Sequence, residues 1–239
     1  MRLALFLVPI SLLAQSLPFP GPGGVAAPAG PAIGTRKVCF AQASSPSAAV
    51  DMSGADLIVA AIASVNGGGT LTLTDSRGSN DSKYASNMTG PATQTSPGIS
   101  WTWAQNASVG AGQTFSISVG GGQQVAACIY GISLMNTSSP FETRGTEAQA
   151  SSGTVQPGAV TPGSGYQAIL AGIAYDNGTG NAVSIDSAFS APDCIDFATG
   201  VNYGMCLSAK IQSGSAAAHP TYSHTPGTLT AANTVFQGQ

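Results

Sequence analysis

The sequence predicts an all-β fold, an antiparallel β-sandwich built from two similar halves. Residues 56–65 (DLIVAAIASV) and residues 167–174 (QAILAGIA) are short apolar runs, and turn residues follow each of them at once. Runs of this kind, rich in β-branched residues and too short for most helices, are typical of strands buried on both faces. Elsewhere apolar and polar residues alternate, which predicts antiparallel strands with one side facing solvent.

Four further segments predict the other strands of the first half, and they are residues 70–74, 99–107, 115–119 and 125–130. Glycines separate the last two segments, which predicts a β-hairpin between them. Residues 75–82 are rich in Asp, Ser and Asn and predict a turn. No amphipathic helical stretch longer than two turns stands out, so the chain is expected to be all-β.

The second half of the chain repeats this pattern at an offset of about 104 to 112 residues. Its strand candidates are residues 167–174, 183–187, 203–211, 219–227 and 229–236. Such a period is far too long for a solenoid or a propeller blade, so it predicts two structurally similar halves. No linker-like break separates the halves, which favours one sandwich over residues 36–239 rather than two small ones.

The N-terminus predicts export. Residues 1–16 combine Arg2, an apolar stretch and a small-x-small cleavage site, as a secretory signal peptide does. The apolar stretch is shorter than the roughly 17–25 residues that a membrane span needs. Residues 17–35 are rich in Pro, Gly and Ala and predict a flexible segment. The expected location is therefore extracellular or on the cell surface, with no membrane span.

Composition excludes several partners. Charged residues make up 7% of the chain and the formal net charge is −3, whereas typical soluble domains are about 25% charged. The low charge does not indicate disorder, because 43% of the residues are hydrophobic and can supply a core. No basic surface for nucleic acid or anionic lipid is expected, so nucleic-acid binding is excluded.

Export makes the four cysteines candidates for disulfides. Cys194 and Cys206 flank a candidate hairpin, so this pair is favoured and leaves Cys39 to pair with Cys128. Buried free thiols are the alternative, because a free cysteine packs as a small hydrophobe. No C-x-x-C spacing occurs, which disfavours a metal site built on these residues.

Motifs for nucleophilic, nucleotide or zinc chemistry are absent from the sequence. His219 and His224 are the only histidines, and residues five apart on a strand point to opposite faces. We therefore expect solvated histidines on an edge strand rather than a shared site. A carbohydrate-active enzyme would need paired carboxylates, and the candidates are Asp186, Asp193, Asp196, Glu142 and Glu147, with Asp193 and Asp196 as the favoured pair.

Two groups of residues are candidate binding sites. Trp101 and Trp103 share one face of a predicted strand. Facing solvent they would form a stacking platform for sugar rings, and facing inward they would be core residues. Asp75, Asn80 and Asp81 offer oxygens to Ca²⁺ from one loop, with Asx turns that cap the loop as the alternative. No other cofactor is expected.

Several segments resemble a known pattern of the form "DLIVV … VTDSxGNxY". They are DLIVA at residues 56–60, LTDSRGSN at residues 73–80 with Tyr84, SPFE at residues 139–142 and the closing strand at residues 229–236. The pattern is similar to that of a loosely defined group of secreted bacterial and phage-associated jelly-roll sandwiches of unassigned function. The resemblance covers roughly residue 39 to the C-terminus and implies a jelly-roll-like sandwich, but no catalytic residue. Residues 79–83 depart from it, because the tight "GN" turn is not matched.

Together these observations predict a secreted, non-enzymatic β-sandwich that serves as a surface, adhesion or carbohydrate-binding module with glycans as partners. One alternative is a structural subunit of an extracellular fibre or coat, which would self-associate with like subunits by strand exchange. A carbohydrate-active enzyme is the third possibility.

Overall fold

The computed structural model describes residues 29–65, 70–90, 97–120, 124–176, 183–186, 188–197, 203–225 and 227–239. The predicted signal peptide and residues 17–28 of the predicted flexible segment lie outside the described residues. The described chain is mostly antiparallel β-structure, as the sequence predicts. In this part of the chain, no helix is long and apolar enough to cross a bilayer.

The first half forms a four-stranded antiparallel sheet in the order β1-β6-β2-β4. These strands are β1 (Lys37–Ala41), β6 (Val125–Ile132), β2 (Leu57–Ser64) and β4 (Gly98–Gln105). The run predicted to be buried on both faces is β2, and every residue of it is buried. One face of the sheet is covered by β3 (Leu71–Asp75), β5 (Phe115–Val119) and the short helix α1 (Asp81–Asn87).

The second half forms a six-stranded sheet in the order β12-β13-β10-β15-β7, with β8 also paired to β15. Its strands are β12 (Asp193–Phe197), β13 (Tyr203–Ser213), β10 (Tyr166–Tyr175), β15 (Leu229–Gln237), β7 (Phe141–Arg144) and β8 (Ala148–Ala150). A small sheet in the order β11-β14-β9 covers its outer face. The small sheet consists of β11 (Ser184–Ile185), β14 (Tyr222–His224) and β9 (Gly153–Val155).

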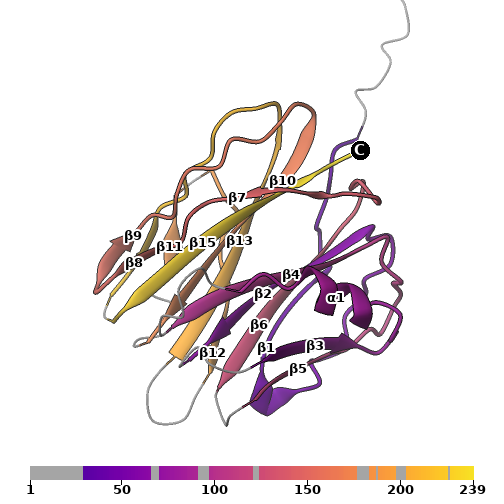
Figure 1. Cartoon of the computed structure of the whole chain (residues 1–239), viewed down its shortest axis with the longest axis horizontal. Helices are drawn as coiled ribbons and strands as arrows, with labels where there is room; N and C mark the ends of the chain where they lie inside the picture. The colour runs from indigo at the N-terminus through magenta and orange to yellow at the C-terminus, as the bar shows by residue number, and fades with distance from the viewer. Residues whose placement is uncertain are drawn as a thin grey trace, which may run out of the picture.

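The two larger sheets pack face to face, so the halves share one hydrophobic core (Figure 1). That core takes side chains from β2, β4 and β6 on one side and from β10, β13 and β15 on the other. Trp103 stacks on Phe141 of β7 with ring centroids 4.8 Å apart. A Cβ atom at Gly172 of β10 would lie 3.5 Å from the Trp101 ring. The largest side chains of the first half are therefore buried against the second half.

The predicted hairpin between residues 115–119 and 125–130 is wrong, although both segments are strands. Within the described sheets β5 pairs with β3, whereas β6 pairs with β1 and β2. Phe115 and Ile117 of β5 belong to the same buried cluster as Ile129 of β6. The strands therefore pack face to face in two sheets, which buries apolar side chains that an isolated hairpin would leave exposed.

Both favoured cysteine pairs form disulfides, and no free cysteine remains in the described chain. Cys39–Cys128 joins β1 to β6, and Cys194–Cys206 joins β12 to β13. The partners are direct cross-strand neighbours with Cα atoms 4.1 Å apart in each pair. The free-thiol alternative is therefore wrong, because neighbouring strands bring each pair within bonding reach.

The described end of the predicted flexible segment contacts the folded body. Ala32 forms a β-bridge with Ser133. The Arg36 guanidinium donates hydrogen bonds from Nη2 to the Ala32 carbonyl at 2.9 Å and to Ser133 Oγ at 3.0 Å. Residues 29–35 therefore run along the domain rather than apart from it.

Candidate functional site

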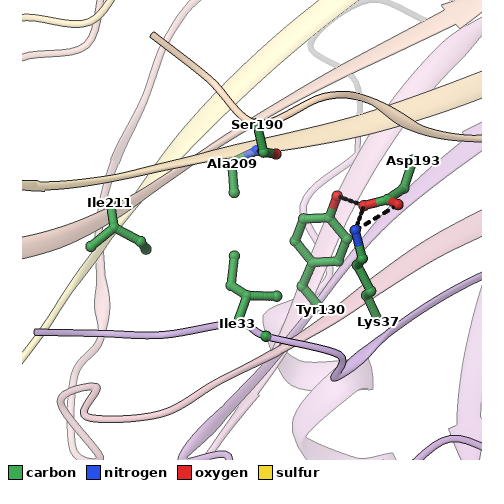
Figure 2. A pocket seen from close by; sticks show the side chains of 8 residues that line it. Ile33, Lys37, Tyr130, Ser190, Asp193, Ala209 and Ile211 are labelled. Carbon is green, nitrogen blue, oxygen red and sulfur yellow. Dashed lines mark hydrogen bonds and ion pairs between the residues drawn. The ribbon is translucent and has the colours of Figure 1, made fainter.

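A pocket of about 230 Å³ lies at the seam between the two halves (Figure 2). We call it the seam pocket, and its lining residues are Ile33, Gly34, Lys37, Tyr130, Ser190, Asp193, Ala209 and Ile211. Lys37 and Tyr130 come from β1 and β6 of the first half, whereas Asp193 comes from β12 of the second. Figure 2 shows both side chains reaching the Asp193 carboxylate, with Ile33, Ala209 and Ile211 along the other side.

The Asp193 carboxylate is the polar centre of the seam pocket. Lys37 Nζ lies 2.8 Å from both carboxylate oxygens. The Tyr130 hydroxyl lies 2.5 Å from Asp193 Oδ2 and 2.8 Å from the Leu207 carbonyl oxygen, and its one proton serves both acceptors. The Lys37 and Asp193 side chains stay 41% and 29% exposed. A solvent-accessible ion pair adds little stability, about 0–1 kcal/mol, so its polar groups remain available to a ligand.

Both disulfides lie next to the backbone of Asp193. Its carbonyl oxygen lies 3.6 Å from the Sγ atoms of Cys39 and Cys128. This is a packing contact, because a disulfide sulfur carries no proton to donate. The next residue, Cys194, is bonded to Cys206 on β13. The strand that carries the carboxylate is thus fixed before any ligand arrives, which reduces the ordering cost of binding.

Two hydroxyl groups that line the seam pocket already take part in hydrogen bonds within the protein. Burial, together with the hydrogen bond to Asp193, raises the pKa of Tyr130 far above its usual value, so the phenol stays a neutral donor. Ser190 Oγ already accepts a hydrogen bond from the Ala209 amide at 3.0 Å. Neither a histidine nor a cysteine is among the lining residues of the described pocket.

The two tryptophans do not form the sugar platform that the sequence allowed. Trp101 and Trp103 are only 2% and 8% exposed, because they face the second half across the shared core. Rings covered in this way cannot stack on a sugar ring. The platform hypothesis is therefore corrected in favour of the core alternative.

The three candidate calcium ligands do lie together, but protein donors bond to four of their five side-chain oxygens. Asp75 is buried, and its Oδ2 accepts hydrogen bonds from side chains of Asn80, Tyr84 and Gln113 at 2.8, 2.9 and 3.0 Å. Its Oδ1 accepts from the Arg77 amide at 2.8 Å, which is an Asx turn.

Asp81 Oδ1 accepts from the Asp75 amide at 2.9 Å, and Asn80 Oδ1 from the Ser108 amide at 2.9 Å. The loop is therefore held by its own donors, as the Asx-turn alternative predicts. Within the described chain, no group of three or more His, Cys, Asp or Glu side chains could hold a metal ion.

The carboxylate pair considered for an enzyme is not brought together. Asp193 and Asp196 are three positions apart on β12 and face opposite sides of the sheet. Asp193 faces the seam pocket, whereas Asp196 accepts a hydrogen bond from the Tyr175 hydroxyl at 2.5 Å. The two carboxylates therefore cannot flank one glycosidic bond.

The histidines differ from the expectation of two solvated side chains on an edge strand. His219 is exposed, but His224 is buried and lies against Tyr175 with ring centroids 4.3 Å apart. His224 belongs to β14, which is the middle strand of its small sheet. The pattern of a short strand does not reveal whether neighbours pair on both sides, so the edge assignment was wrong.

Sequence reasoning did not single out Lys37 and Tyr130. A weak signal was present, because Lys37 and Asp193 each lie within two positions of a cysteine in a chain with only 7% charged residues. Searches of known protein families, of curated proteins and of solved structures find no match to the chain. The seam pocket therefore has to be interpreted from its own chemistry.

Proposed function

We propose that the protein is a secreted, non-enzymatic β-sandwich module of the cell surface that binds a small polar group, such as one sugar unit of a glycan, in the seam pocket. The observation that carries the proposal is the Lys37–Asp193–Tyr130 cluster beside an apolar wall at Ile33 and Ile211. Sugar hydroxyls accept from an ammonium and donate to a carboxylate, and the carbon face of a sugar packs on aliphatic side chains.

The dimensions of the seam pocket support a small ligand. Sites for drug-sized molecules measure about 300–1,000 Å³, and the seam pocket measures about 230 Å³. Ile211, at 37%, is the exposed large hydrophobic side chain of the described surface, and it lines this pocket. A single ring, at the end of a chain or as a branch, suits this volume better than an extended oligomer.

The covalent framework supports secretion. Two disulfides persist in oxidising compartments such as the extracellular space. The predicted signal sequence at residues 1–16 points to the same compartment. Low charge and few exposed apolar side chains suit a module that meets glycans rather than nucleic acid or lipid.

We further infer that the halves are a jelly-roll repeat. The strand orders β1-β6-β2-β4 and β7-β15-β10-β13 support this inference, because strands that correspond in sequence take the same places. The first order is that of a jelly roll without its second and fifth strands. In the second half β9 and β12 stand at those two places in chain order; β9 joins the small sheet, whereas β12 pairs with β13 in the larger sheet. The resemblance to secreted jelly-roll sandwiches agrees with this inference.

A titration with simple sugars followed by glycan-array binding tests the proposed function. We expect Lys37→Met, which keeps most of the aliphatic stem, to weaken binding at least tenfold. Lys210→Met is the matched control, because Lys210 lies on β13 between two lining residues and points to the other face. The proposal fails if the natural protein binds no glycan at millimolar concentration, or if both variants bind equally well.

The second candidate function is that of a subunit of a fibre or coat, and it is favoured by the contacts that residues 29–36 make with the folded domain. The same segment of a neighbouring copy could make these contacts instead, as in domain swapping. Light scattering should then show concentration-dependent polymers that disappear when residues 17–35 are deleted. A monomer with and without this segment would rule out the assembly.

A further inference from the structure

The polar side of the seam pocket keeps a free donor next to a free acceptor. The Lys37 ammonium carries three N–H groups, and at most two of them serve the Asp193 oxygens, each at 2.8 Å. A carboxylate oxygen accepts about two hydrogen bonds, and Asp193 Oδ2 already accepts from Lys37 and from the Tyr130 hydroxyl. Among the described residues, Oδ1 accepts from Lys37 alone. At least one N–H of Lys37 and one place on Asp193 Oδ1 therefore remain for a ligand.

This polar side is electrically neutral as a whole. Lys37 and Asp193 are the charged side chains among the described lining residues, and they form an ion pair at 2.8 Å. An anionic ligand bound to Lys37 would lie beside the carboxylate, and a cationic ligand bound to Asp193 would lie beside the ammonium. Like charges so close together repel each other. The ion pair therefore favours a neutral ligand.

The opposite side of the seam pocket is apolar. It is formed by Ile33, Ala209 and Ile211, whose side chains lie across from the ion pair in Figure 2. Ile211 is 37% exposed, so a ligand that covers it removes apolar surface from water. The pocket measures only about 230 Å³, so one small ligand contacts both sides at once. Such a ligand needs a donor and an acceptor side by side, with an apolar group next to them.

Building on the proposed glycan binding, we propose that the seam pocket selects N-acetylhexosamines, which are neutral sugars with an acetamido group. The acetamido N–H donates to Asp193 Oδ1, and the neighbouring ring hydroxyl accepts from Lys37. Adjacent substituents on a sugar ring lie side by side, as these two protein groups do. The acetamido methyl group then packs against Ile211 and its apolar neighbours. A plain hexose offers the same hydrogen bonds but has no methyl group for this wall.

Calorimetric titration of the secreted chain with glucose, glucosamine and N-acetylglucosamine tests the selectivity, and the three galactose counterparts form a second series. In at least one series we expect the N-acetyl sugar to bind at least tenfold more tightly than its parent hexose, since an apolar pocket gains about tenfold or more from one carbon group. The amino sugar should bind more weakly than the hexose, because its ammonium would lie beside Lys37.

Two variants test the apolar wall and the ion pair separately. Ile211→Ser removes an apolar contact and should reduce the preference for the N-acetyl sugar at least threefold, with the affinity for the hexose unchanged. Asp193→Asn leaves Lys37 without its counter-charge, so this variant should bind glucuronate more tightly than glucose, whereas the natural chain should bind it more weakly. Lys210→Met is the control and should keep both preferences, because Lys210 points to the other face of β13.

The results distinguish the acetamido assignment from the proposed function beneath it. Equal binding of the N-acetyl sugar and its parent hexose in both series would overturn the assignment but leave glycan binding intact. A preference that survives Ile211→Ser would also overturn it, since the methyl group would then lie elsewhere. If none of the six sugars binds at millimolar concentration, the assignment and the proposed function are both wrong.

Discussion

The first half covers the free edge of its larger sheet with a helix, whereas the second half adds a strand at the same place. β4 and β13 each pair with the long buried strand of their sheet, β2 or β10. In the first half, α1 and the residues after it cap the outward carbonyls of β4. Asn87 Nδ2 donates to Trp103 O at 2.8 Å, and Lys83 Nζ donates to Gln105 O at 2.9 Å. In the second half β12 pairs with β13, and Cys194–Cys206 fastens the two strands.

This difference shows that the exposed edge of a sheet can be covered by a helix or by an added strand, with different consequences. An uncovered sheet edge offers unpaired backbone groups to other chains, so both halves have to satisfy it. Side chains from a helix do so without adding another edge. An added strand brings its own side chains to the seam, and Asp193 is the first residue of β12. The seam pocket therefore exists because the second half used a strand.

A second comparison concerns one aspartate in each half. Asp75 ends β3 and Asp186 follows β11, and each accepts from the amide two positions ahead. Asp186 also accepts from the Thr221 amide at 3.0 Å and stays partly exposed. Asp75 instead is buried among three side-chain donors. The same turn is thus a surface feature in one half and a core network in the other.

The largest expected effect on stability comes from removing a disulfide, and it should differ between the two disulfides. Cys39–Cys128 spans 89 positions and Cys194–Cys206 only 12, so the first restrains the unfolded chain more. Replacing both cysteines of a pair by alanine should lower the free energy of unfolding by about 4.5 kcal/mol for Cys39–Cys128 and about 3 kcal/mol for Cys194–Cys206. Urea unfolding of the two double variants measures the difference. Equal losses would mean that local packing, not chain restraint, dominates.

The next effect tests whether the halves are separable. Trp103→Ala removes a ring that stacks on Phe141 and meets Phe236 edge-on, and it should lower the free energy of unfolding by about 4 kcal/mol. Unfolding should remain a single transition when followed by fluorescence and by circular dichroism, because the core is shared. Ile211→Ala, at an exposed position, is the control and should change stability by less than about 0.5 kcal/mol. Two separate transitions would show independent halves.

The aspartate comparison predicts an intermediate effect. Asp75→Ala leaves three buried donors unsatisfied and should lower the free energy of unfolding by about 3 kcal/mol. Asp186→Ala should lower it by about 1 kcal/mol, because water replaces the lost acceptor at a partly exposed site. Hydrogen exchange after Asp75→Ala should accelerate in α1 and β3 first. Equal destabilisation by both variants would contradict the difference in burial.

The smallest expected effect on stability concerns the edge of β4, which α1 covers. Asn87→Ala frees the Trp103 carbonyl and should lower the free energy of unfolding by about 1 kcal/mol. It should also increase self-association in light scattering, because β4 becomes open to another strand. Ser86→Ala, which loses only an exposed bond to the Ser82 carbonyl, is the control. An Asn87→Ala variant as monomeric as the control would show that α1 shields the edge by bulk alone.

Much of the strand content could be predicted because a buried strand has a local run of apolar residues in its sequence. β2 and β10 lie within two residues of the apolar runs that predicted them, and β5 has the predicted bounds. The cysteine pairing could be favoured because Cys194 and Cys206 flank a hairpin that the sequence predicts. Within the candidate site, Asp193 was named as a carboxylate of interest, but Lys37 and Tyr130 were not. They lie on strands far from it in sequence, and no local pattern joins them.

By itself the sequence determined the β-class and the two buried strands and favoured the cysteine pairing, since alternation, apolar runs and spacing each act over a few residues. Only the tertiary structure decided which strands pair, so that β5 and β6 entered different sheets despite the glycines between them. It also turned Trp101 and Trp103 inward and brought Lys37 to Asp193. These outcomes depend on contacts between distant segments, where the area buried by two packed sheets outweighs what a turn favours locally.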